Sequence, residues 1–224
     1  MSTTTEKIEF LSSYLTKRRK ALIDQVLAQR TDQITLVLED VYHAQNISAA
    51  IRTAECFGIQ DIHIVERLHQ YQVNPRIVRG SAKWLNLVHY HMEDYQDPSQ
   101  QCINTLKNQG FTIYATSPAE EALPMNEVIF NGPSAFIFGT EFTGITDSAA
   151  RLADHLIRIP MYGFTESFNI SVSVALILQT VKNQFTVSGH ELSLSAERRE
   201  QVKLDWYKKA VKHADHLLTL FEKE

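Results

Sequence analysis

The stretch Ile34–Glu66, "ITLVLEDVYHAQNISAAIRTAECFGIQDIHIVE", decides the fold class of this chain. Its two ends, "ITLVLEDV" and "DIHIVE", are short apolar runs rich in β-branched residues, a composition typical of buried strands. Between them, Ile47, Ile51 and Ala54 recur at helical spacing, and Gly58 follows as a helix stop. A strand, a helix and a second strand in succession predict an α/β domain with a largely parallel sheet.

The alternation of strands and helices continues along the chain. Further strands are expected at "LNLVHYH", "FTIYAT", "SAFIFG" and "HLIRIPM". Helices are expected at "PSQQCINTLKNQG", at "TDSAARLA" and from Asn169 to about Phe185. The first thirty residues and the stretch Ala196–Phe221 are each expected to form one amphipathic helix. We therefore predict a helical extension at 1–30, an α/β domain at 31–185 and a second helical extension at 186–224.

Composition limits the classes of protein to which the chain can belong. A length of 224 residues is enough to bury a core, and 44% apolar with 21% charged residues is ordinary for a globular protein. The formal net charge of −4 gives no global positive field that would indicate a nucleic-acid partner. Cys56 and Cys102 lie in apolar contexts that suit buried thiols in a reducing compartment. The N-terminal "MSTTTEKIEF" lacks a signal-peptide pattern and no apolar run could span a bilayer, so we expect a soluble, cytoplasmic protein.

Several common site motifs are missing from the sequence. None of the eight glycines forms a G-x-G-x-x-G fingerprint, and no P-loop occurs, which disfavours nicotinamide-dependent dehydrogenases and nucleotide hydrolases. No cysteine and histidine cluster has zinc spacing. His89 and His91 alternate on an expected strand, and His213 and His216 share a helix face. We interpret both pairs as surface or core histidines rather than metal ligands.

Ligands usually bind an α/β sheet beyond the carboxyl ends of its strands, so the loops after strands matter most. The first such loop, "EDVYHAQNISAAIRTAE", places Asn46 at the expected N-cap of a helix. Arg52 follows on the same helix, away from its apolar stripe. It could pair with Glu55 on the next turn, or bind a phosphate or a developing oxyanion near the helix N-terminus. The residues alone leave both interpretations open.

Two later loops also carry unexplained polar residues. In "FIFGTEFTGITD", turn chemistry accounts for Gly139 and Gly144 but leaves Glu141 unexplained. In "IPMYGFTESFNIS", Ser167 and Asn169 directly precede one of the most apolar runs of the chain. They could cap a buried helix, or they could belong to a site built at its start.

Together, "NISAAIRTAE", "FGTEFTGI" and "IPMYGFTESFNISVSVA" resemble three signatures of the tRNA (guanosine-18) 2′-O-methyltransferase (TrmH) family, within the SPOUT superfamily. The resemblance runs from about Lys17 to Phe185. It implies an α/β domain whose C-terminal part forms a deep trefoil knot, an exception to the rule that chains are unknotted. It also implies a homodimer that uses S-adenosylmethionine, without a metal, to methylate a ribose 2′-oxygen of tRNA.

The resemblance assigns roles to individual residues. It implies that the cofactor pocket is lined by Thr116, Gly139, Ile159, Met161 and Phe168. The family assigns the activation of the ribose hydroxyl to the arginine matching Arg52; because arginine rarely loses its proton, we expect Arg52 to hold the phosphate and ribose in position. The other residues of the constellation, which orient substrate and knot loop, are Asn46, Glu141, Ser167 and Asn169. The implied RNA contacts are Lys17, Arg18, Arg19, Lys20 and Lys83, although a solvated helix face is the alternative for the first four.

Two positions depart from the family pattern. The helix after Asn169 usually carries several arginines, whereas "QTVKNQF" leaves only Lys182, which puts the identity of the RNA contact in doubt. Phe168 replaces the usual leucine and keeps an apolar wall. The alternatives to tRNA methylation are methylation of ribosomal RNA and a SPOUT-like RNA-binding protein without catalysis. The joint presence of the catalytic set disfavours the inactive protein.

Overall fold

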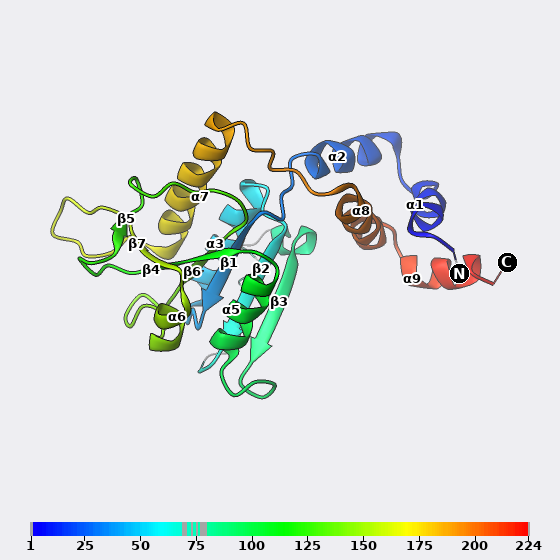
Figure 1. Ribbon diagram of the computed structural model, residues 1–224. Helices are drawn as coiled ribbons and strands as arrows, with labels where there is room; N and C mark the ends of the chain where they lie inside the picture. The colour runs from blue at the N-terminus through cyan, green and yellow to red at the C-terminus, as the bar shows by residue number, and fades with distance from the viewer. Residues whose placement is uncertain (1, 69–70, 73, 75, 77–79, 224) are drawn as a thin grey trace. The chain divides into compact units, whose positions relative to one another are not determined.

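The computed structural model describes residues 2–68, 71–72, 74, 76 and 80–223. The chain divides into two compact units (Figure 1). One consists of residues 32–191, and the other combines residues 1–31 with residues 192–224. In the part of the chain that the structure describes, none of the helices combines the length and apolar character that a membrane span needs.

Residues 32–191 form an α/β unit around a seven-stranded sheet with the order β3-β2-β1-β6-β4-β7-β5. Every described strand pair is parallel, which confirms the expected largely parallel sheet. The strands are β1 (Ile34–Glu39), β2 (Asp61–Glu66), β3 (Asn86–His91), β4 (Thr112–Thr116), β5 (Leu123–Pro124), β6 (Ser134–Phe138) and β7 (His155–Arg158).

Helices cover both faces of this sheet (Figure 1). On one face, Val37, Ile113 and Ile137 of the strands pack in one buried cluster with Leu106 and Ala149 of two helices. On the other face, two further helices pack against each other. Because both faces are covered, β1 and β6 are buried at every residue, as central parallel strands usually are. The helices of this unit are α3 (Ala44–Cys56), the 3₁₀ helix η1 (Ser81–Trp84), α5 (Pro98–Asn108), α6 (Asp147–Leu152) and α7 (Ile170–Val187).

Four helices make up most of the described part of the second unit. Arg30 is buried in this unit, and its guanidinium lies 5.2 Å from the centroid of the Trp206 ring, a cation–π contact. Ion pairs tie the elements together at the surface, with 2.7 Å between Lys203 and Asp24. The helices are α1 (Thr4–Ser12), α2 (Lys17–Leu27), α8 (Ala196–Ala210) and α9 (Ala214–Phe221).

Each end of the chain holds two helices where the sequence pattern predicted one. The first helix ends at Ser12, and Thr16, in extended conformation, begins the next by accepting the Arg19 N–H at 3.2 Å. The second break lies at His213, whose φ of 57° is left-handed and cannot continue a right-handed helix. The helical periodicity of the sequence continues across both breaks, so it does not predict the caps that separate the helices. The basic residues from Lys17 onward therefore open a helix instead of lying inside one.

The two cysteines differ in burial, contrary to the expectation that both are buried. Cys102 is buried, and burial raises the pKa of its thiol. Cys56 is exposed because it ends α3 outside the apolar stripe of that helix.

Candidate active site

The carboxyl ends of four neighbouring strands hold the predicted site residues. In the order β1-β6-β4-β7, all strands are parallel, so their carboxyl ends meet at one edge of the sheet. The loop after β1 leads to Asn46, the loop after β6 contains Glu141, and the loop after β7 leads to Asn169. The sheet order thus collects three separate sequence motifs at a single edge.

A direct contact joins the first and third motifs. The Asn169 side-chain amide donates a hydrogen bond of 3.3 Å to Oδ1 of Asn46, across 123 positions of sequence. Asn169 is also the N-cap of α7, where its Oδ1 accepts the Ser171 N–H at 2.9 Å and the Ser171 hydroxyl at 2.8 Å. Capping uses the oxygen of this side chain and the contact with Asn46 uses its nitrogen. The capping interpretation of Asn169 is confirmed, and the contact with Asn46 is compatible with the site interpretation, which stays a prediction.

Asn46 is not an N-cap, so that prediction was wrong. Helix α3 begins two residues earlier at Ala44, and His43 is its N-cap, without a side-chain capping bond. The backbone N–H groups of Asn46 and Ile47 bond to the His43 carbonyl at 2.9 and 3.1 Å. Backbone hydrogen bonds thus close the first turn, and the Asn46 side chain serves the contact with Asn169 instead.

Arg52 presents its guanidinium to solvent. The residue is exposed on α3, and within the described ranges it forms neither a hydrogen bond nor an ion pair, so the alternative of a pair with Glu55 is not realised. An exposed guanidinium without a carboxylate partner retains all its donors for a ligand, and its planar fork suits a phosphate.

Glu141 lies in a tightly closed turn after β6. Backbone hydrogen bonds of 2.9 and 3.1 Å join Thr140 and Gly144 in both directions, and the Thr140 hydroxyl accepts the Thr143 N–H at 2.9 Å. Gly144 has a φ of +68°, which favours glycine. A Cβ at Gly139 would lie 2.1 Å from the Gly144 carbonyl carbon, so close backbone packing requires glycine there. The turn holds Glu141 as an exposed carboxylate.

Glu39 supports the segment that follows this turn, and the sequence motifs did not point to it. It is 1% exposed, and its carboxylate accepts the Thr146 N–H and the Thr146 hydroxyl, each at 2.8 Å, and the Ser99 hydroxyl. A buried carboxylate needs such partners to offset its desolvation. Glu39 therefore ties the end of β1 to the segment that follows Glu141. The signal available in the sequence was an acidic residue inside the apolar run "ITLVLEDV".

The neighbouring Asp40 shapes the loop after β2 in a similar way. Its backbone φ of 54° is left-handed, and its Oδ1 accepts the N–H groups of Arg67 at 3.0 Å and of Leu68 at 2.8 Å. Aspartate tolerates this conformation better than most residues. Glu39 and Asp40 therefore hold, by hydrogen bonds, the loop after β6 and the loop after β2 at the carboxyl edge of the sheet.

The predicted cofactor residues follow adjacent strands. Thr116 ends β4, pairs with Ile157 of β7 and donates its hydroxyl to the Ile137 carbonyl at 2.9 Å. Ile159 and Met161, in the loop that follows β7, are half-buried. Phe168 is 39% exposed. These side chains combine apolar character with partial exposure next to the carboxyl edge.

The predicted RNA contacts have different surroundings. Lys17 and Arg18 are exposed at the start of α2, and Arg19 and Lys20 are half-buried. Cations in the first turn of a helix oppose its dipole, so helix stability does not explain this basic cluster. Lys83 is exposed, with its ammonium 5.2 Å from the Trp84 ring centroid.

Lys182 is the basic residue of α7, in a helix where the family usually carries several arginines, and it has a partner within the protein. Its ammonium donates a hydrogen bond of 2.8 Å to the Phe57 carbonyl, at the end of α3. Carbonyls in the last turn of a helix lack partners within the helix, and a cation there is favourable. This contact fastens α7 to α3.

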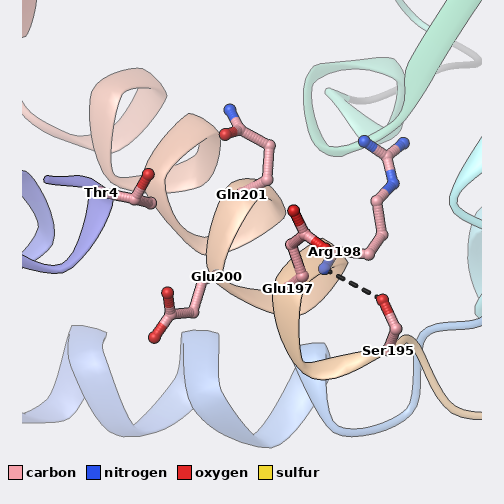
Figure 2. A pocket seen from close by; sticks show the side chains of 6 residues that line it. All are labelled: Thr4, Ser195, Glu197, Arg198, Glu200 and Gln201. Carbon is pink, nitrogen blue, oxygen red and sulfur yellow. Dashed lines mark hydrogen bonds between the residues drawn. The ribbon is translucent and has the colours of Figure 1, made fainter.

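A pocket of about 410 Å³ in the helical unit is unrelated to these residues (Figure 2). Figure 2 shows Ser195 accepting the Arg198 N–H, a helix cap with a distance of 3.1 Å. None of the predicted cofactor residues lines this pocket, and its polar lining offers no apolar wall for an adenine ring. Its lining consists of Thr4, Ser195, Glu197, Arg198, Glu200 and Gln201.

Comparison with known proteins identifies the class. The SpoU rRNA Methylase family matches residues 33–179. The tRNA (guanosine(18)-2′-O)-methyltransferase of Borreliella burgdorferi is 36% identical over 208 residues, 93% of each chain. The enzyme of the same name from Thermus thermophilus is 34% identical over 197 residues, covering 87% of this chain and 98% of the relative.

Solved structures agree with the sequence comparison. The crystal structure of the A. aeolicus TrmH/SpoU tRNA modifying enzyme superposes with a TM-score of 0.78 and 28% identity, over 88% of this chain and 98% of that chain. The SpoU methyltransferase AviRb from Streptomyces viridochromogenes, in complex with the cofactor AdoMet, shares the fold, with a TM-score of 0.58 and 21% identity over 72% and 61% of the two chains.

The parallel sheet and the motifs collected at its carboxyl edge define a SPOUT-type methyltransferase. Within this class, the chain belongs to the SpoU rRNA methylase family.

Proposed function

We propose that the protein transfers a methyl group from S-adenosylmethionine to the 2′-hydroxyl of guanosine 18 in tRNA. The contact between Asn46 and Asn169 carries the proposal, because it joins the loop leading to Arg52 with the loop leading to the apolar side chains of the cofactor set. The relatives named tRNA (guanosine(18)-2′-O)-methyltransferase support this substrate, since they match nearly the whole chain. Methylation of ribosomal RNA is the second candidate, favoured by the name of the family.

The residues of the proposed cofactor pocket suit S-adenosylmethionine. Adenine needs apolar walls, which the half-buried Ile159 and Met161 and the exposed Phe168 can supply. Backbone groups of Thr116 and Gly139 at two strand ends would bind its polar atoms, which explains why no glycine fingerprint is needed. The bound cofactor supplies an activated methyl group on a sulfonium sulfur, so the residues need only orient and activate the acceptor.

Arg52 has the central role in handling the substrate. A ribose hydroxyl is a weak nucleophile near neutral pH, so its orientation and its proton decide the rate. The exposed guanidinium of Arg52 binds the phosphate beside the target ribose and aligns the 2′-oxygen for in-line attack. Its constant positive charge also favours the developing alkoxide.

The remaining polar residues position this arrangement. Asn169 fixes Asn46 through the bond of 3.3 Å, so the two amides act as one unit beside the substrate. Glu141 is exposed on its closed turn and can accept hydrogen bonds from the ribose or from Arg52. Ser167, also exposed, precedes the cap of α7 and contributes a hydroxyl to the same region.

The basic cluster at the start of α2, Lys17–Lys20, would bind the tRNA backbone. The chain has a net charge of −4, so attraction to RNA must come from local positive charge. Each phosphate that the cluster neutralises would release counterions and make the affinity depend on salt. Lys83 adds a second basic position.

We accordingly assign RNA binding to residues 1–30, methyl transfer to 31–185 and an accessory helical extension to 186–224.

We further propose a homodimer whose α/β domain is knotted in its C-terminal part. Apolar side chains support the dimer: Val172 is 43% exposed and Leu176, one turn later on α7, is 38% exposed. Both flank the start of the helix that Asn169 caps. A second subunit that covers this face would bury them beside the site. A tRNA substrate also agrees with a cytoplasmic location.

The proposed activity is tested by incubating the purified protein with labelled S-adenosylmethionine and separate pools of tRNA and ribosomal RNA. We expect 2′-O-methylguanosine in tRNA, and loss of the label when guanosine 18 is replaced in a transcript. Label in ribosomal RNA alone would transfer the assignment to the second candidate. tRNA binding without any methyl transfer would identify an inactive RNA-binding protein.

A further inference from the structure

Three side chains outside the proposed active site converge on one point of the sheet. Glu66 ends β2, and His89 and His91 lie on the neighbouring edge strand β3. Nδ1 of each histidine lies 2.9 Å from the same carboxylate oxygen, Oε2 of Glu66. One ligand atom from each residue lies within 4.8 Å of the other two.

The strand register explains this convergence. Glu66 pairs with His91 across the two parallel strands, and His89 lies two positions earlier on β3, on the same face. The two imidazole rings are nearly parallel, with an angle of 11° and centroids 5.6 Å apart. The register of the two paired strands sets the backbone positions of all three residues.

The carboxylate of the cluster is buried, whereas its two imidazoles are partly exposed to solvent. The Glu66 side chain is 8% exposed, whereas those of His89 and His91 are 31% and 43% exposed. The second carboxylate oxygen of Glu66 accepts the backbone N–H of Tyr71, which fixes the orientation of the carboxylate. A ligand that approaches from solvent would meet both imidazoles and reach the carboxylate between them.

The donor set suits a divalent transition metal. Two imidazole nitrogens and a carboxylate oxygen are preferred ligands of Zn²⁺, whereas Mg²⁺ prefers oxygen alone. Zinc bonds of about 2.0–2.2 Å in a tetrahedron place neighbouring ligand atoms about 3.3 Å apart. The two nitrogen–oxygen distances of 2.9 Å are close to this separation, so small side-chain movements would admit the ion. Water would complete the coordination on the open side.

We infer that Glu66, His89 and His91 form a binding site for a divalent transition metal ion, with Zn²⁺ as its expected occupant. The sequence alone did not indicate this site, because its ligands come from two different strands. The two histidines by themselves were interpreted as surface or core residues. Without metal, Nδ1–H of each imidazole donates to the carboxylate, and binding of the ion at Nδ1 requires that proton to move to Nε2 or to water. The ion would cross-link the edge strand to its neighbour.

The test titrates untagged, metal-free protein with Zn²⁺ against a competing chromogenic chelator. We expect one equivalent to bind per chain, and a weakening of roughly a hundredfold or more in the double variant His89→Ala/His91→Ala. Thermal melting should show that Zn²⁺ raises the Tm of the unmodified protein and leaves that of the variant unchanged. Replacement of zinc by Co²⁺ should give visible absorption bands that the variant lacks.

A matched control separates this site from other histidines of the chain. The double variant His213→Ala/His216→Ala removes the same number of imidazoles from the helical unit and should bind Zn²⁺ as the unmodified protein does. Far-ultraviolet circular dichroism confirms that each variant is folded. Absence of stoichiometric binding, or equal affinity after loss of His89 and His91, would overturn the inference. Equal affinity for Mg²⁺ would contradict the assigned metal class.

Discussion

The side chains of Asn46 and Asn169 meet at 3.3 Å, although 123 positions separate them in the sequence. Asn169 contributes its nitrogen to this contact and keeps its oxygen for the cap of α7. The start of α7 is therefore connected to the first turn of α3, the helix that carries Arg52. This connection explains why polar residues directly precede the apolar run of α7.

The two uses of the Asn169 amide can be separated by mutation. Asn169→Asp keeps the capping oxygen but replaces the donor to Asn46 by a second acceptor. We expect near-normal stability and a large loss of methyl transfer. Asn169→Ala removes both functions and should also lower the free energy of unfolding by about 1 kcal/mol. Urea unfolding and single-turnover methylation check the pair. Because the Asn46 amide can rotate to donate to the new carboxylate, full activity in both variants would be needed to show that the contact is dispensable.

Arg52 is expected to affect turnover without affecting the fold. Arg52→Ala should abolish methyl transfer while the affinity for S-adenosylmethionine stays nearly intact, because the exposed side chain has no described protein partner to lose. Arg52→Lys keeps the charge but not the planar fork, so it should recover only part of the rate. Cofactor titration and methylation kinetics provide the two measurements. Unchanged turnover in Arg52→Ala would remove the residue from the mechanism.

Gly139 and Gly163 both lie in loops at the carboxyl edge of the sheet, but they differ in the space available for a side chain. A Cβ at Gly139 would lie 2.1 Å from the Gly144 carbonyl carbon, whereas a Cβ at Gly163 has no neighbour within 4 Å. Gly139→Ala should therefore displace the turn that holds Glu141 and destabilise the protein by about 1–3 kcal/mol or more. Gly163→Ala should change stability little. Equal unfolding midpoints for both variants would contradict the packing of this turn.

The sequence predicted the parallel sheet well because strand composition and helical periodicity are local signals. The boundaries of β2 at "DIHIVE" and the start of α7 after Asn169 agree with the structure. The family motifs likewise depend on residue identities at short spacings. Local signals thus identified every strand of the sheet except the two-residue β5 (Leu123–Pro124), and they identified the three loops that meet at one edge.

What the sequence did not reveal depends on contacts between distant elements. Glu39 supports Thr146, and Glu66 meets His89, only because the strand order places these residues together. The breaks before Lys17 and at His213 depend on caps and a left-handed residue, which helical periodicity does not register. The basic cluster therefore begins a helix, and its function needs its own test.

The basic cluster should determine the salt dependence of tRNA binding. Replacing the exposed Lys17 and Arg18 by glutamine should weaken binding and reduce the slope of log affinity against log salt concentration by about 2, one for each lost phosphate contact. The matched control replaces Lys208 and Lys209 of α8, which changes the net charge equally. Filter binding at several salt concentrations gives both slopes. An unaltered slope in the first variant would make the cluster a solvated helix face.

His63 should make the stability of the protein depend on pH. Burial lowers its pKa from 6.5 to about 4, against the opposing charge of Asp61, and Nδ1 shares a hydrogen bond of 3.1 Å with the Tyr90 hydroxyl. The unfolded chain therefore binds a proton between about pH 6.5 and 4 that the folded chain does not. This contribution to stability is complete above pH 6.5 and decreases as the pH falls toward 4.

The corresponding experiment compares the unmodified protein with His63→Gln by urea unfolding at two pH values. Between pH 7 and pH 5, the unmodified protein should lose about 2 kcal/mol more stability than the variant, because glutamine does not titrate. The absolute stability of the variant does not matter, since only the difference between the two pH values is compared. Equal losses in both proteins would show that His63 takes up its proton as readily in the folded sheet as in the unfolded chain.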